Sequence, residues 1–394
     1  MINMNRCFND LKGSYLFYNI AQKVNAFLAE NPGTRLLRMG IGDVTLPLAP
    51  AVIGALNEAV EDQSKKESFH GYLSELGWEP LREAVSGYYK DMGVSVPSCD
   101  IFISDGASPD LANILRLFSL DNTVLVTEPA YPAYVDTNVM MGRKIAHLPS
   151  GKENGFLPLP QKGMQADIIY LCSPANPTGA VYSKEQLKKW VEHANETGSV
   201  IIFDAAYEAF ISDPALPRSI YEIDGAEDCA IEICSLSKTA GFTGTRLGYT
   251  VVPSALTRSQ MSLRDMWIRH KTTNTNGVSY IIQKGAAAVF TPEGREQITR
   301  NIDYYRKNAG MITDTLDRLG IWYTGGKNSP YVWLECPDKM GSWDFFDLLL
   351  TKINVVGTPG AGFGKCGEGY FRLTSFSTNE DTAEAMKRLY EIFR

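Results

Sequence analysis

The sequence contains no long run of apolar residues. Within its 394 residues, no uncharged hydrophobic stretch approaches the roughly 18 residues that a membrane-spanning helix needs. The first eight residues also lack the apolar stretch of a signal peptide. We therefore expect a cytoplasmic protein that does not associate with a membrane.

Histidine is scarce, and the cysteines are scattered along the chain. The chain has four histidines and seven cysteines, with no C-x-x-C pair and no histidine at ligand spacing from a cysteine or another histidine. We therefore expect no metal site. Free thiols buried in a reducing compartment are the simpler interpretation of the cysteines.

Positive charge is also in short supply. Lysine and arginine number 38 against 45 aspartates and glutamates, a formal net charge of −7, and no block of basic residues stands out. A protein that binds nucleic acid by neutralising phosphates should be basic, so we expect no nucleic-acid partner. With 44% hydrophobic and 21% charged residues, the composition is that of a globular protein, and the length allows two to three domains.

Short apolar runs alternate with helical patterns between residues 97 and 252. The runs are Ile101–Ser104, Val124–Val126, Ile168–Leu171, Val200–Phe203, Ala230–Cys234 and Gly248–Val252. Such runs, separated by helices, predict an α/β fold with a mostly parallel, mixed sheet covered by helices on both faces. The clearest helix is Lys184–Thr197, which a capping box from Ser183 to Gln186 begins and Gly198 ends.

The last third of the chain has a different pattern. Residues 255–320 are predicted to be helical. Strands are expected within Ile321–Leu334, Val355–Thr358 and Tyr370–Ser375, flanked by helices near 342–352 and 379–393. We expect a small C-terminal α+β domain over residues 301–394, a large domain over 46–300, and an N-terminal segment, 1–45, that joins the small domain and covers the site.

One segment after a predicted buried strand carries the strongest chemical signal. Ser235 and Ser237 stand beside Lys238, and Arg246 follows eight positions later. A lysine amine can form a Schiff base with a carbonyl cofactor, and hydroxyls with a guanidinium suit its phosphate. A surface lysine at the start of a loop is the alternative, but it does not account for the four residues occurring together.

Two further segments follow predicted strands. Asp204 would lie at the carboxyl end of its strand, where ligands bind in open α/β sheets, and a buried carboxylate needs a positive partner such as a protonated pyridine nitrogen. A helix cap is the alternative for Asp204. Asn176, held between Pro174 and Pro177, would point at a ligand, although an ordinary Asn-Pro turn explains that residue equally well by itself.

These three segments, in this order, resemble the fold-type I aminotransferases that use pyridoxal 5′-phosphate. The resemblance covers nearly the whole chain. Within that group, the sequence is most similar to the LL-diaminopimelate aminotransferase family. The supporting segments are Gly13–Phe17, Gly40–Leu48, Gly71–Tyr72, Ile103–Ala107, Pro129–Tyr134, Phe203–Asp213 and Lys238–Pro253.

The resemblance implies a role for each matching residue. Lys238 would hold the cofactor and move the substrate proton, and Asp204 would keep the pyridine nitrogen protonated. Asn176 and Tyr207 would bind the phenolic oxygen. Tyr131 would stack on the ring, unless it is simply a core tyrosine. The phosphate would be bound by Ser235, Ser237, Arg246, the amides of Ala107 and Ser108, and Tyr72 of a second subunit, which implies a homodimer with shared sites.

The same resemblance implies substrate contacts. Arg372 would bind the substrate α-carboxylate through its guanidinium fork, unless it is a surface arginine on an edge strand. Tyr15, Gly42, Glu75 and Asn276 match further contacts, with Asn276 donated by the partner chain. For Tyr15 and Glu75, packing and a solvated charge are the alternatives.

The chain departs from the family at two positions near the distal end of the substrate. Ser108 stands where the family usually has a lysine, and Leu73 stands where a glycine usually follows Tyr72. The expected reaction is amino transfer between an amino acid and a 2-oxo acid, LL-diaminopimelate and tetrahydrodipicolinate with glutamate and 2-oxoglutarate. An aminotransferase for aromatic or other neutral amino acids and a pyridoxal-phosphate-dependent C–S lyase remain the alternatives.

Overall fold

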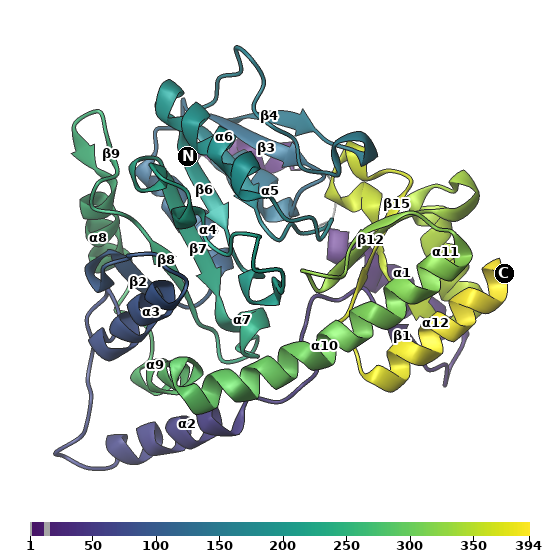
Figure 1. Cartoon of the computed structure of the whole chain (residues 1–394), viewed down its shortest axis with the longest axis horizontal. Helices are drawn as coiled ribbons and strands as arrows, with labels where there is room; N and C mark the ends of the chain where they lie inside the picture. The colour runs from purple at the N-terminus through teal and green to yellow at the C-terminus, as the bar shows by residue number, and fades with distance from the viewer. Residues whose placement is uncertain (1, 12–15) are drawn as a thin grey trace.

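The computed structural model describes residues 2–11 and 16–394. The chain forms a larger body around a seven-stranded sheet and a smaller body around a four-stranded sheet, joined by one long helix (Figure 1). None of the helices in these two ranges is long and apolar enough to cross a membrane.

The large sheet is mixed and mostly parallel, as the sequence predicted. Its strand order is β2 (Ile101–Ser104), β8 (Gly248–Val251), β7 (Ala230–Ser235), β6 (Val200–Asp204), β5 (Ile168–Cys172), β3 (Thr123–Glu128) and β4 (Lys144–Pro149). Strand β8 runs antiparallel to both neighbours, and all other pairs are parallel. Strands β5, β6 and β7 are buried along their whole length, which explains why they are continuous apolar runs rather than alternating ones.

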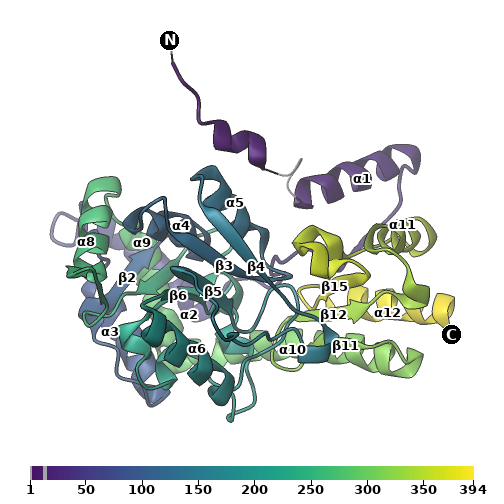
Figure 2. The ribbon, with the colours of Figure 1, turned by 90° about the horizontal axis from the view of Figure 1, so that it is seen from above.

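Helices cover both faces of this sheet (Figure 2). They are α2 (Pro50–Gln63), α3 (Glu79–Asp91), α4 (Ala107–Asn113), α5 (Pro132–Met140), α6 (Lys184–Thr197), α8 (Leu263–Asn274) and α9 (Tyr280–Ala287). Successive residues of a strand point to opposite faces. In β5, Ile169 packs in one core with Trp190 of α6, whereas Tyr170 packs in the other with Trp267 of α8.

Helix α6 has the bounds that its end signals predicted. Ser183 accepts a hydrogen bond from the Gln186 amide at 3.2 Å, and the Gln186 side chain accepts one from the Ser183 amide at 2.9 Å. Gly198 ends the helix in the left-handed conformation, with φ of 74°. The capping box and the C-terminal glycine therefore form as expected.

The small body combines the two ends of the chain. Its antiparallel sheet has the order β11 (Tyr323–Gly325), β12 (Tyr331–Glu335), β15 (Tyr370–Thr374), β14 (Thr358–Pro359). Helices α1 (Leu16–Glu30), α11 (Ser342–Ile353) and α12 (Asn379–Phe393) pack around it, and β1 (Leu37–Arg38) pairs with β13 (Val355–Val356). The N-terminal segment is thereby attached to the C-terminal sheet.

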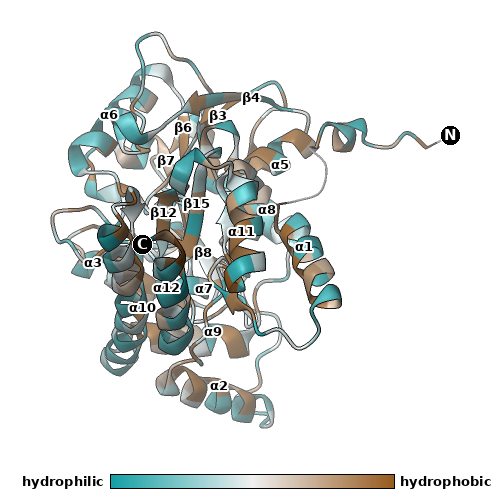
Figure 3. Ribbon diagram, turned by 90° about the vertical axis from the view of Figure 1, so that its right-hand side faces the viewer, coloured by the Kyte–Doolittle hydropathy of each residue, from teal (hydrophilic) through white to brown (hydrophobic). Residues whose placement is uncertain are grey.

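Helix α10 (Pro292–Leu319) connects the two bodies. Its 28 residues span about 42 Å at 1.5 Å per residue. The outer surfaces of α10 and α12 are hydrophilic and the strands behind them hydrophobic (Figure 3). The domain limit expected at residue 300 falls inside α10, and the expected limits stay a prediction.

Three features had no counterpart in the sequence analysis. Strand β4 has mostly half-exposed and exposed residues, so no apolar run marks it. A short hairpin of β9 (Thr257–Arg258) and β10 (Met261–Ser262) interrupts the stretch 255–320, which was expected to be helical throughout. The stretch 321–334 contains two strands, and the turn between them begins where the first ends at Gly325. Gly325 and Gly326 are both at positive φ, where glycine avoids the strain of a side chain.

Candidate active site

The candidate site is a cavity of about 330 Å³ at the carboxyl edge of the large sheet. Most of the residues that the sequence predicted line it, namely Gly42, Ala107, Ser108, Tyr131, Asn176, Asp204, Tyr207, Ser235, Ser237, Lys238, Arg246 and Arg372. Tyr72, Glu75 and Asn276 do not line it, and Tyr15 lies outside the described residues. One cavity thus unites residues that are up to 330 positions apart (from Gly42 to Arg372).

The strand ends explain this convergence. Strand β6 ends at Asp204 and the adjacent parallel strand β7 ends at Ser235, so the segments that follow them leave the sheet at the same edge. Helix α7 (Leu236–Thr239) follows at once, with Ser235 Oγ accepting from the Ser237 amide at 3.1 Å. This cap begins the turn that carries Lys238 into the cavity.

Asp204 is a buried carboxylate without a cationic partner. Its side chain accepts hydrogen bonds from the Tyr134 hydroxyl at 2.6 Å and the Ala206 amide at 3.0 Å. Burial raises the pKa of Asp204 above its usual value, against these two hydrogen bonds. No lysine, arginine or histidine among the described residues forms an ion pair with it. A protonated ring nitrogen would provide the missing positive charge.

Lys238 is prepared for nucleophilic chemistry. Burial, assisted by the positive charges of Arg246 and Arg372, lowers the pKa of Lys238 to about 8, while Asp43 opposes the shift. A larger share of the amine is therefore neutral near neutral pH than for an exposed lysine. Only the neutral amine can attack a carbonyl group or accept a proton.

Arg246 is one of two arginines that line the cavity. Its Nη1 donates to Ser237 Oγ at 3.1 Å and to the Thr243 carbonyl at 3.2 Å, and no carboxylate in residues 2–11 and 16–394 pairs with it. Gly106 lies beside it at φ of 131°, a conformation that residues with a side chain rarely adopt, and a Cβ atom there would also displace Arg246 Nη2, which is 2.3 Å away. The guanidinium, two serine hydroxyls and the start of α4 suit a phosphate.

Arg372 is the second arginine that lines the cavity. It is 1% exposed and lies on β15, which has neighbours on both sides, so the surface-arginine alternative is wrong. Nη1 donates to Asn176 Oδ1 at 2.6 Å, Nη2 donates to the Gly40 carbonyl at 2.8 Å, and Nε has no partner. The described residues offer no carboxylate to this buried cation. A buried charge is costly without a counter-ion, so the geometry favours a carboxylate ligand.

A comparison with protein families places this chemistry in a known group. The model for aminotransferase class I and II matches residues 34–389. The chain belongs to the class I and II aminotransferase family. A curated LL-diaminopimelate aminotransferase of Agathobacter rectalis is 50% identical, over 99% of both chains. One of Lawsonia intracellularis is also 50% identical, over 99% of this chain and 98% of the other.

Solved structures agree with the family. The L,L-diaminopimelate aminotransferase from Chlamydomonas reinhardtii superimposes with a TM-score of 0.94 at 40% identity, over 100% of this chain and 99% of the other. The cofactor of this aminotransferase is pyridoxal 5′-phosphate, and the unpaired Asp204, the lysine of lowered pKa and Arg246 all fit it. When bound, the cofactor withdraws electrons from the substrate α-carbon and stabilises the carbanion formed there.

Three polar residues in or beside the cavity were not among those predicted from the sequence of this aminotransferase. Tyr134 donates to Asp204, Tyr331 shares a 2.8 Å hydrogen bond with Tyr207 and lies 4.3 Å from the Arg372 guanidinium, and Asp43 lines the cavity near Lys238. Asp43 and Tyr134 occur within segments that carried the family resemblance, so that signal was available. Tyr331 lies in an ordinary apolar strand, and no local pattern marks it.

Three of the predicted residues meet elsewhere on the surface. The loop that holds Tyr72 and Glu75 lies against the loop that holds Asn276. The close approach is shown by Gly277, where an added Cβ atom would be 3.2 Å from the Ser74 carbonyl oxygen. Tyr72 is 86% exposed. These residues therefore form one exposed patch, the 72–75/276 patch, outside the cavity of their own chain.

Proposed function

We propose that this aminotransferase transfers the amino group of LL-diaminopimelate, with glutamate and 2-oxoglutarate as the other substrate pair and tetrahydrodipicolinate as the corresponding oxo-acid form. Support for the substrate comes from the full-length identity of 50% to two relatives that bear this name. The observation that carries the reaction type is one cavity with Lys238 and two arginines that lack acidic partners.

The residues divide the work by their chemistry. Arg246, Ser235 and Ser237 bind the phosphate, and Asp204 holds the ring nitrogen in its protonated form. Arg372 binds the α-carboxylate of either substrate, since its Nε has no protein partner. Lys238 Nζ would take the proton from the substrate α-carbon and deliver it to the C4′ carbon of the cofactor, a task that a pKa of about 8 suits.

Ser108 and Asp43 are proposed to face the distal end of the substrate. Both line the cavity. Diaminopimelate carries an ammonium and a carboxylate at that end, so Asp43 offers a partner to the ammonium even though Ser108 replaces the usual lysine. A neutral substrate would have no use for Asp43, which is why we favour diaminopimelate over an aromatic amino acid.

We further propose a homodimer in which the 72–75/276 patch of one subunit completes the cavity of the other. Large apolar side chains are exposed nearby, with Ile53 43%, Val60 53% and Phe69 63% accessible. Such a group of exposed apolar side chains is typical of an interface. The expected cytoplasmic location belongs to the same proposal, supported by seven free cysteines, as a reducing compartment favours.

An amino-donor screen tests the substrate. Loss of cofactor absorbance is followed for LL- and meso-diaminopimelate, glutamate, aromatic amino acids and cystathionine. We expect LL-diaminopimelate and glutamate to give the highest kcat/KM. A clear preference for aromatic donors would contradict the diaminopimelate assignment, and steady release of pyruvate and ammonia from cystathionine would replace transfer by C–S cleavage.

Subunit mixing tests the dimer. Chains carrying Lys238→Ala and chains carrying Tyr72→Phe are each expected to be impaired, and mixing them should restore activity because one site in the hybrid keeps both residues. Subunit exchange is checked independently by mass. Exchange without recovery would show that Tyr72 does not complete the partner's cavity.

A further inference from the structure

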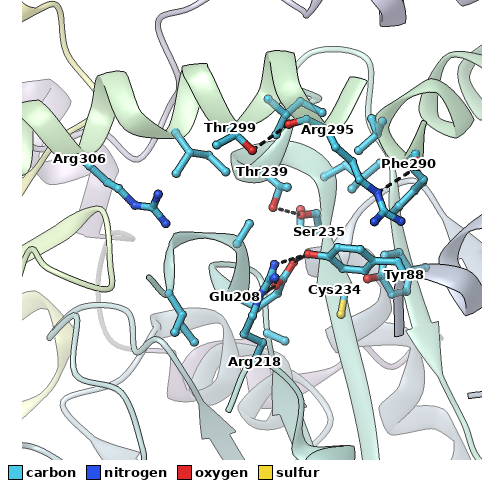
Figure 4. A pocket seen from close by; sticks show the side chains of 18 residues that line it. Tyr88, Glu208, Arg218, Cys234, Ser235, Thr239, Phe290, Arg295, Thr299 and Arg306 are labelled. Carbon is cyan, nitrogen blue, oxygen red and sulfur yellow. Dashed lines mark hydrogen bonds and ion pairs between the residues drawn. The ribbon is translucent and has the colours of Figure 1, made fainter. Parts of the chain in front are cut away.

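A second cavity, of about 310 Å³, lies behind the active site between α10 and the sheet edge (Figure 4). We call it the rear cavity. Its lining comes mainly from α3, the segment after β6, the end of β7 with α7, and residues 295–306 of α10. It is nearly as large as the active-site cavity.

The two cavities share a wall that is one chain thick. Of the segment after β6, residues 204, 206 and 207 line the active site, whereas 205, 208 and 209 line the rear cavity. Around α7, residues 237 and 238 line the active site, 236 and 239 line the rear cavity, and Ser235 lines both. A molecule in the rear cavity would therefore touch the backbone that positions Asp204 and Lys238.

Three guanidinium groups surround the rear cavity. Figure 4 shows Arg306 and Arg295 reaching into it from α10, with Arg218 across from them. Arg218 pairs with Glu208 at 2.5 Å and also contacts Tyr88. Tyr88 lies between two of the arginines, 5.3 Å from the Arg218 guanidinium and 5.5 Å from that of Arg295.

The charge inside the rear cavity is positive. Glu208 is the only acidic side chain that the described part of the chain contributes to the lining, and Arg218 and the Tyr88 hydroxyl already bind it. The acidic partners of Arg295 and Arg306 are not part of the lining and are more than half exposed, at 59% and 58%. Solvent screens such exposed partners, so they do not neutralise the interior.

The donors of Arg306 are incompletely used. Nη1 pairs with Asp303 at 2.8 Å, Nη2 donates to the Phe210 carbonyl at a long 3.3 Å, and the buried Nε has no hydrogen-bond partner. A buried donor without a partner costs free energy. An acceptor on a bound molecule would remove that cost.

We propose that the rear cavity binds a small dicarboxylic acid and that its occupancy changes the turnover of the aminotransferase. Arg306 would bind one carboxylate, and Arg295 the other. Ile298, Ile302 and Phe290 would contact a short carbon skeleton, which a bare inorganic anion lacks. This proposal does not depend on which amino acid is the physiological substrate.

Binding is measured on the holoenzyme by calorimetry with glutarate, which has two carboxylates and no amino or oxo group to react. The expected stoichiometry is two glutarates per chain, one at Arg372 in the active site and one in the rear cavity. Arg306→Gln should reduce this to one, or weaken one of the two affinities by about tenfold or more, the effect of losing one charge-assisted hydrogen bond. Arg295→Gln should act in the same way through the opposite end.

Arg300→Gln is the matched control. Arg300 lies on the same helix, is 63% exposed, pairs with Glu296 and does not line the cavity. It should keep both glutarate sites. A wild-type stoichiometry of one, or Arg306→Gln and Arg295→Gln binding like wild type, would overturn the site.

Turnover tests the coupling separately. When the amino acid and the 2-oxo acid are both saturating, glutarate is displaced from the active site in both half-reactions, so a change of kcat can come only from the rear cavity. We expect such a change in wild type and in Arg300→Gln and its loss in Arg306→Gln, with the kcat of that variant normal when glutarate is absent. Two glutarates bound with no change of kcat would overturn the coupling. Failure of the diaminopimelate assignment would leave the binding results unaffected.

Discussion

The active-site cavity and the rear cavity lie on opposite faces of the same two chain segments, yet their charges are arranged differently. Among the residues that the structure describes, Arg372 and Arg246 of the active site have no acidic partner, and Asp204 has no basic one. In the rear cavity, each arginine has an acidic partner at 2.5 to 2.8 Å. The difference indicates that the active site depends on its ligands for charge balance, whereas the rear cavity keeps partial charge compensation when it is empty.

The largest expected difference in kcat is between substitutions of two adjacent residues, Lys238 and Thr239, which line different cavities. Lys238→Ala should abolish turnover, because the amine that forms the Schiff base and moves the proton is gone. Thr239→Val, one residue further on the rear side, should keep kcat near the wild-type value. Both variants are assayed for kcat and for the absorbance of the bound cofactor. Near-normal turnover of Lys238→Ala without added amines would refute the role of Lys238.

Asp204 in the active site and Glu208 in the rear cavity should respond differently to loss of their charge. Asp204→Asn should lower kcat about a hundredfold or more, because the amide does not favour the protonated ring and each unit of ring pKa is worth about 1.4 kcal/mol. Glu208→Gln should instead lower the free energy of unfolding by about 1–2 kcal/mol, since Arg218 loses its partner but stays partly solvated. Thermal melts and kcat of both variants separate the outcomes. An unchanged kcat in Asp204→Asn would place this residue away from the ring.

Replacing one arginine of each cavity by lysine keeps the positive charge and should again affect the active site far more than the rear cavity. Arg372→Lys should lower kcat/KM about a hundredfold, because an ammonium cannot form the two parallel bonds of a guanidinium fork. Arg306→Lys should change kcat/KM less than about twofold, as a half-exposed ion pair contributes little. Steady-state kinetics with glutamate decide between them. Equal effects would mean that the two cavities are not functionally distinct.

The smallest expected effect concerns Ser108. If Asp43 pairs with the distal ammonium of diaminopimelate, as proposed, and the distal carboxylate stays solvated, Ser108→Lys adds only a solvated charge pair and should change kcat/KM for this donor by no more than about fivefold. The comparison is made with an aromatic donor in the same variant. An increase of tenfold or more for diaminopimelate would show that wild type lacks a distal partner and is adapted to a neutral substrate.

The features that could be predicted from the sequence are those with a local signal in the chain. The sheet strands, the capped helix α6 and the residues at strand ends were predicted because each depends on a few consecutive residues. Asp204 and Lys238 are of this type, since Asp204 ends β6 and Lys238 lies three residues after the end of β7, and polar residues at such strand ends emerge at the carboxyl edge of the sheet. The hairpin at residues 257–262 and the edge strand β4 were missed because neither has a strong apolar pattern.

The 72–75/276 patch shows how far the family resemblance and the fold of a single chain each reach. The resemblance to a family singled out Tyr72, Glu75 and Asn276, and the fold brings them together on the surface, outside the cavity of their own chain. Their contribution to a partner's site stays a prediction, because one chain contains no contact that could test it.

By itself, the sequence determined the α/β architecture of the large domain and the chemistry of the lysine, aspartate and arginines at its centre. Periodicity and strand ends are local properties, and they can be recognised without knowing what packs against them. Only the tertiary structure decided that Arg372 is buried without an acid, that Tyr134 and Tyr331 support the cavity, and that a second cationic cavity lies behind Lys238. These properties depend on side chains from distant segments, whose contacts and burial arise only when the chain is packed.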